Sequence, residues 1–224
     1  MNFAQACQGV RNVLNRMQGV TQVDNILLNE AEKYISWSGR RPGILKGVYY
    51  PLEYQSLLDR QDYSILLSDG SFFQFYYSFD LEGGLSKARL AYYPRPLETM
   101  DSLDDLYAAA DEALDREDDD LYEYLYNWTE VMEFKGVKPS NTSHIRFDYD
   151  RGVAAHCESH IQFSGVNSLR VGADFFPLPM AFVKFCESLV SDGQSLVSED
   201  QLGFEKNNFL RINSPGLIIS LRHL

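Results

Sequence analysis

The sequence has few cysteines and no long hydrophobic run. Its three cysteines, Cys7, Cys157 and Cys186, are too few and too scattered for a disulfide framework. No stretch approaches the ~18 consecutive apolar residues that a membrane-spanning helix needs. Residues 1–19 also lack the basic start and the continuous apolar stretch of a secretory signal. We therefore expect a soluble, cytoplasmic protein with reduced thiols that does not enter a membrane.

Sequence motifs of several large enzyme classes are also missing. There is no glycine-rich phosphate loop, no Gly-x-Ser-x-Gly turn and no Cys-x-x-Cys pair. The pair Gly83-Gly84 lies where a turn between strands is predicted, and no helix follows it. We expect no cofactor, and the sequence leaves open whether the protein is an enzyme.

Basic residues are outnumbered by acidic ones, 20 to 32, which gives a net charge of −12. The excess is local, because thirteen carboxylates and a single base, Arg116, lie between Asp101 and Glu133. An acidic protein binds nucleic acid poorly without a local basic site, so another protein is the favoured partner. The acidic segment, with Asp118, Asp119 and Asp120 in its middle, is either a solvated helix face or a docking surface for a basic partner.

Aromatic residues, at 13% of the chain, favour half-buried strands, and the sequence as a whole predicts an α+β fold. Apolar residues at three- and four-residue spacing predict N-terminal helices over about 2–36. The first of these ends near Gly19, and the second runs from about Asn25 to Ser36.

A sheet is predicted over about 47–93. Asp69-Gly70 separates two runs rich in aromatic and aliphatic residues, which is a strong signal for a tight turn between strands. A third strand, from Lys87 to Tyr93, follows a second turn. Successive strands with such short connections must be antiparallel, so this part should be a meander.

Helices and a second β region complete one predicted domain over 1–224. An acidic helical region covers about 101–134, with a break near Asp118, and its apolar stripe is expected to pack on the sheet. The second β region and its helices cover about 143–224. Its expected elements are strands at 144–150, 156–163 and 168–171, a helix at 180–190 and a last hairpin from 209–212 and 217–221.

Polar residues alternate along the strands of this second β region. The alternation places His144, Arg146, Asp148 and Asp150 on one face of the first strand. His156 and His160 share a face of the next strand, and Arg170 lies in the third. Together these side chains could perform acid–base chemistry beside an arginine that holds a phosphate. A metal site is not favoured, because there is no cysteine pair or helical His-Glu-x-x-His frame. The remaining interpretation is an ordinary polar sheet surface.

Several short segments resemble one known family. They are Asp69-Gly-Ser-Phe-Phe-Gln-Phe-Tyr76, Ile145-Arg-Phe-Asp-Tyr-Asp150, Ala155-His-Cys-Glu-Ser-His160, Ser168-Leu-Arg-Val-Gly172 and Pro177-Leu-Pro-Met-Ala-Phe-Val-Lys-Phe185. This pattern is similar to the domain of unknown function 2290 family, over roughly two thirds of the chain. The pair Ser159-His160 and Arg170 correspond to the family's most recognisable polar positions. Gln162 stands where the family has a second histidine.

The resemblance implies a prokaryotic or mobile-element origin and a role in defence against phage, but no activity. Two hypotheses follow. The first is a non-catalytic interaction subunit of a multi-protein system that docks through the acidic helices or the polar sheet face. The second is a metal-independent nuclease, in which His160 is the acid or base and Arg170 holds the phosphate.

Overall fold

The protein is described here from a computed structural model, which places residues 1–40, 48–97, 102–138, 143–153, 157–163, 170–190, 209–212 and 218–219. Its main sheet has ten strands, all but one pair antiparallel. The strands of the main sheet are β1 (Thr21–Asp24), β2 (Ile26–Asn29), β3 (Tyr34–Trp37), β4 (Ile65–Leu67), β5 (Phe72–Phe79), β6 (Leu85–Tyr93), β7 (Ile145–Asp150), β8 (Ser159–Phe163), β9 (Arg170–Ala173) and β12 (Ile218–Ile219).

Five helices accompany the sheet in the described part of the chain. They are α1 (Phe3–Arg16), α2 (Tyr50–Asp59), α3 (Leu103–Asp115), α4 (Asp119–Lys135) and α5 (Pro179–Val190). Two further strands, β10 (Phe175–Pro177) and β11 (Phe209–Arg211), form a separate antiparallel pair. The predicted α+β class is confirmed, as are the first N-terminal helix and the helix at 180–190.

The main sheet runs in the order β1-β4-β5-β6-β7-β8-β9-β12, and β3 pairs both with β2 and with one end of β5. The predicted meander is therefore confirmed as β4-β5-β6. Gly70, in the turn between β4 and β5, has a φ of 92°, a conformation that glycine adopts without the strain that a side chain would add.

Two expectations for the first half of the chain are wrong. The predicted helix from Asn25 to Ser36 is the hairpin β2–β3, whose turn includes Lys33 with a φ of 52°. The predicted sheet over 47–93 contains α2, which has Pro51 in its first turn. Tyr50, Tyr54 and Leu57 are buried on this helix at three- and four-residue spacing, a pattern that the many tyrosines of the segment obscured.

The predicted hairpin at the C-terminal end is also wrong. β11 pairs with β10, whereas β12 pairs with β9 in parallel. The two segments thus bind different strands. The turn at 214–216 lies outside the described residues.

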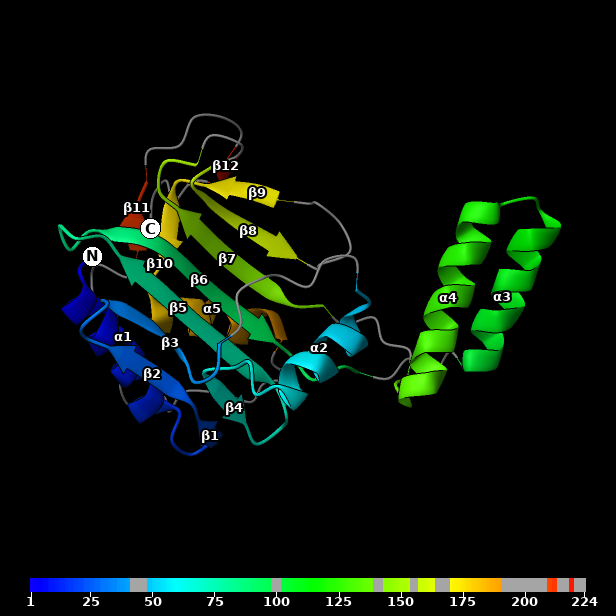
Figure 1. Cartoon of the computed structure of the whole chain (residues 1–224), viewed down its shortest axis with the longest axis horizontal. Coiled ribbons are helices and arrows are strands. Elements are labelled where there is room, and N and C mark those ends of the chain that lie inside the picture. The colour runs from blue at the N-terminus through cyan, green and yellow to red at the C-terminus, as the bar shows by residue number, and fades with distance from the viewer. Residues whose placement is uncertain are drawn as a thin grey trace.

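Helices α1 and α5 lie behind the sheet and α2 in front of it (Figure 1). The face toward α1 and α5 is the apolar core, because alternate residues of β5, β6 and β7 point into it. Among these core residues are Phe73, Phe75, Tyr77, Leu90 and Phe147. A smaller apolar cluster lies under α2, where Tyr50, Tyr54 and Leu57 pack against residues such as Phe72 and Tyr93.

Helices α3 and α4 form a hairpin, which stands to one side of the sheet (Figure 1). β6 and β7 are hydrogen-bonded neighbours, so the whole helical hairpin is inserted between two adjacent strands. The expectation that its apolar stripe packs on the sheet is wrong. The two helices bury Ala110 and Ala113 of α3 and Thr129 and Met132 of α4 within the hairpin instead.

Candidate functional site

The face of the sheet opposite α1 and α5 carries most of the polar residues of β6, β7 and β8. We call this the polar face, and define it by Tyr76, Lys87, Arg89, His144, Arg146, Asp148, Asp150, His160, Gln162 and Arg170. The register places seven of these residues in two rows across the strands, and Lys87 faces Asp150 in a third. One row runs Tyr76, Arg89, Asp148, His160, and the other runs Ala91, Arg146, Gln162, Arg170.

Asp148 is the centre of the polar face. Its Oδ1 accepts a hydrogen bond of 2.8 Å from Nε of Arg89, and its Oδ2 accepts one of 2.8 Å from Nε of Arg146. Nε2 of His160 lies 3.7 Å from the same Oδ2. Alternation along β7 and the pairing of its two neighbours thus bring two guanidinium groups and an imidazole to one carboxylate.

The electrostatics of Asp148 follow from these contacts. Burial by itself would raise the pKa of this carboxyl group, but the charges of Arg89 and Arg146 outweigh burial and hold the pKa below its ordinary value. Burial likewise opposes the charge on Arg89, yet Asp148 raises the pKa of that guanidinium group. The cluster is therefore a charged one.

Exposure rises along β7, away from α2. The side chain of Arg146 is 2% exposed, that of Asp148 is 16% exposed and that of Asp150 is 38% exposed. Arg89, with a side chain 21% exposed, lies between the buried end of the polar face, near α2, and its solvent-exposed end. The cluster is thus mostly desolvated but can be reached from solvent beside Arg89.

Gln162 and Ser159 have structural partners. Gln162 accepts a hydrogen bond from Nη2 of Arg146 at 2.5 Å, so it holds the buried guanidinium group in place. Ser159 donates a hydrogen bond to the backbone carbonyl of Phe175. Arg170 pairs with Gln162 across the strands, and its side chain is exposed. It lies in the row of Arg146, farther from Asp148.

His144 is on the same face but is buried under α2, away from the Asp148 cluster. Its Nδ1 lies 3.1 Å from Oε2 of Glu53, and both side chains are almost completely buried. The rings of Tyr50 and Tyr93 pack against it. His144 therefore joins α2 to the sheet, whereas Asp148 and His160 meet as the sequence suggested. His156 lies outside the described residues.

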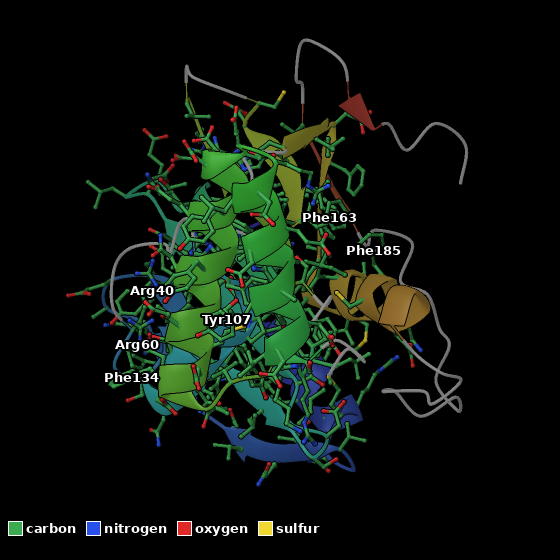
Figure 2. The ribbon with its side chains drawn as sticks, turned by 90° about the vertical axis from the view of Figure 1, so that its right-hand side faces the viewer. Arg40, Arg60, Tyr107, Phe134, Phe163 and Phe185 are labelled. Atoms are coloured by element: carbon green, nitrogen blue, oxygen red, sulfur yellow. The ribbon has the colours of Figure 1, made fainter. Side chains whose placement is uncertain are left out.

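Sequence reasoning missed Arg89, Arg40 and Glu53. Arg89 alternates with apolar residues along β6, but only the pairing of β6 with β7 shows that it reaches Asp148. Cζ of Arg40 lies 3.8 Å from the ring centroid of Tyr76, the cross-strand neighbour of Arg89. Arg40 lies on the side of the molecule opposite α5 and Phe185, as Figure 2 shows. It thus adds a further cation to the polar face.

The α3–α4 hairpin is the second candidate surface. Asp118 caps α4, since its side chain accepts a hydrogen bond from the backbone N–H of Leu121, and Asp119 and Asp120 lie in the first turn. The predicted docking residues thus also stabilise the start of the helix. Large apolar side chains are exposed among the carboxylates: Leu114, Leu121, Tyr124, Val131 and Phe134, the last of them 90% exposed.

The hairpin is acidic enough to affect its tyrosines. Tyr107 of α3 donates a hydrogen bond of 3.0 Å to Glu133 of α4, and Figure 2 shows Tyr107 between the two helices. Partial desolvation, this hydrogen bond and the charges of Glu133 and Glu130 raise the pKa of Tyr107 to about 12. The hydrogen bond between Tyr107 and Glu133 thus joins the two helices of the hairpin.

In the part of the chain that the structure describes, no group of three or more His, Cys, Asp or Glu residues could hold a metal ion. None of the helices placed by the structure is long and apolar enough to cross a membrane.

Comparison with known families gives one match. Residues 20–188 match the family described as "Uncharacterized conserved protein (DUF2290)". The chain belongs to the DUF2290 family. The range that matches the DUF2290 family contains both the polar face and the α3–α4 hairpin, whereas α1 and the strands β11 and β12 lie outside it. No curated protein and no solved structure matches the chain.

Proposed function

We propose that this protein is a non-catalytic interaction subunit of a prokaryotic multi-protein system, and that it binds a basic partner protein through the α3–α4 hairpin. The insertion of the hairpin supports this proposal most directly. β6 and β7 are adjacent and antiparallel, so a turn of a few residues could join them. A helical hairpin at this point adds nothing that the sheet requires. The proposal keeps the role in defence against phage that the family resemblance implies.

The surface of the hairpin has the chemistry of a docking site. Between Ser102 and Lys138 there are twelve carboxylates and three basic residues. Carboxylates one helical turn apart repel each other, and a basic partner would relieve this repulsion. Covering an exposed phenylalanine such as Phe134 contributes about 2 kcal/mol. Charge can thus steer the partner, and apolar contact can hold it.

The test is an affinity purification followed by identification of the bound proteins. The variant Asp119→Lys/Asp120→Lys keeps the cap made by Asp118 and should lose the partner. Glu30→Lys/Glu32→Lys makes the same change of charge at the exposed β2–β3 turn and should keep it. A partner that binds the wild type and both variants equally would contradict the proposal. Higher salt should weaken the true complex, because exposed charges are screened.

The second candidate function is metal-independent cleavage of phosphodiesters. The observation that favours it is the placement of His160 3.7 Å from Asp148, beside two arginines. His160 would act as acid or base, and a carboxylate could orient its ring. Expression of such an enzyme should be toxic to cells, and His160→Ala should relieve the toxicity. A purified protein that is inert on RNA and DNA, with and without divalent metals, would exclude this function.

A further inference from the structure

Two guanidinium groups of the polar face share a single carboxylate, that of Asp148. Arg89 donates through Nε to Asp148, and Arg146 donates through Nε to Asp148 and through Nη2 to Gln162. A guanidinium group carries five N–H donors in a planar fork, more than these bonds take from either arginine. Two guanidinium groups at one carboxylate thus offer donors to a ligand that accepts hydrogen bonds.

The charges on this face lead to the same conclusion. Lys87 and Asp150 form an ion pair with each other, and Glu53 is bound by His144 and Tyr93. Asp148 is then shared by Arg89 and Arg146, and Arg40 and Arg170 add positive charge around them. An uncompensated charge in a desolvated place destabilises the fold. An anion beside Arg89 and Arg146 would offset that cost.

The expected ligand is an oxyanion with several acceptor atoms. The fork of an arginine matches the spacing of two oxygens on a phosphate, and arginine stacked on a tyrosine is well placed to bind the same group. A metal cation would be repelled by the surplus of positive charge. An apolar ligand would leave the donors unsatisfied.

We propose that Arg89, Arg146 and Arg40, on the polar face beside His160, form a binding site for a phosphate group. The site is distinct from the α3–α4 hairpin and does not depend on the docking function proposed for it. It also does not require that the bound phosphate be cleaved. The phosphate could be free, part of a nucleotide or part of an RNA chain, because all three present the same oxygens.

The test is a calorimetric titration of the whole protein with three probes: inorganic phosphate, adenosine 5′-monophosphate and a short single-stranded RNA. At least one probe should bind, and the tightest one identifies the source of the phosphate. The variant Arg89→Gln should weaken its binding at least tenfold. Arg151→Gln should leave the affinity unchanged. Arg151 is a matched control, because it too is an arginine bound to one carboxylate, that of Asp80.

A second variant keeps the test decisive if Arg89→Gln fails to fold. Arg40→Gln leaves the bonds of Asp148 in place and should weaken binding several-fold, because it removes only the cation above Tyr76. Failure of all three probes to bind the wild type would overturn the proposal. Unchanged affinity in the folded Arg89→Gln or Arg40→Gln protein would overturn it as well.

Discussion

The α3–α4 hairpin and the polar face of the sheet use charge in opposite ways. On the hairpin, carboxylates are exposed, far outnumber bases and surround exposed apolar side chains. On the polar face, arginines outnumber carboxylates, and Arg89 and Arg146 are largely desolvated. Exposed charges contribute little to stability but steer association, whereas buried charges must be bonded or the fold loses stability. The hairpin is therefore suited to a macromolecular partner, and the polar face to a small anionic group.

The largest effect that would test this comparison is the loss of the hairpin itself. Replacement of residues 102–138 by a short linker of glycine and serine should abolish partner binding, because the docking surface is then gone. The sheet should persist, since β6 and β7 remain paired through their own hydrogen bonds. Near-ultraviolet circular dichroism would report the sheet core, and affinity purification would report the partner. A partner that is still retained would place the docking surface elsewhere.

The next effect concerns the stability of the polar face. Asp148→Asn should lower the free energy of unfolding by about 3 kcal/mol or more, because two desolvated guanidinium groups lose their shared carboxylate. Asp150→Asn, two residues along the same face, breaks only the exposed pair with Lys87 and should cost less than about 1 kcal/mol. Urea unfolding of the two variants gives both values. Equal losses of unfolding free energy would show that the buried cluster stabilises the fold no more than the exposed ion pair does.

The pH dependence of stability should also depend on Asp148. Its pKa is lowered in the folded protein, so its contribution is complete above the unfolded pKa of about 3.9 and is lost as the pH falls through the lower folded value. Wild-type stability should therefore fall in acid more steeply than that of Asp148→Asn. Urea unfolding across the acidic range measures both curves. Parallel curves would mean that other carboxyl groups cause the loss.

A smaller effect would show whether the α3–α4 hairpin unfolds independently of the sheet. Gly136 ends α4 with a φ of 64°, and a Cβ there would meet nothing within 4 Å. The cost of Gly136→Ala is therefore conformational, about 1 kcal/mol. Amide exchange in the hairpin should become about fivefold faster, while exchange in the sheet stays unchanged. Equal acceleration in both parts would show that they unfold together.

The sequence revealed one half of the polar face better than the other. Strict alternation from His144 to Asp150 placed Arg146 and Asp148 on one side, and the same period placed His160 opposite them. Arg89 was not found, because β6 and β7 are separated in sequence by the hairpin, and no local pattern shows that they pair. Arg40 was missed for a similar reason, since its contact with Tyr76 is tertiary.

The overall fold, too, was predicted correctly only where a local sequence pattern determines it. The meander and the acidic helices follow from local patterns, namely the Asp69-Gly70 turn and the helical spacing in the acidic segment. The hairpin β2–β3 was taken for a helix, because Ile26 and Leu28 in so short a segment do not distinguish the two periods. The apolar residues of α3 and α4 were expected on the sheet, but the helices pack on each other. Which surfaces meet is decided by the whole fold.

The most direct test of the two-surface account measures both kinds of binding on both kinds of variant. Asp119→Lys/Asp120→Lys should lose the partner protein and bind phosphate, or the tightest phosphate probe, as the wild type does. Arg89→Gln should lose the phosphate probe and keep the partner. If either variant loses both activities while it remains folded, the two surfaces form one site, and the account is contradicted.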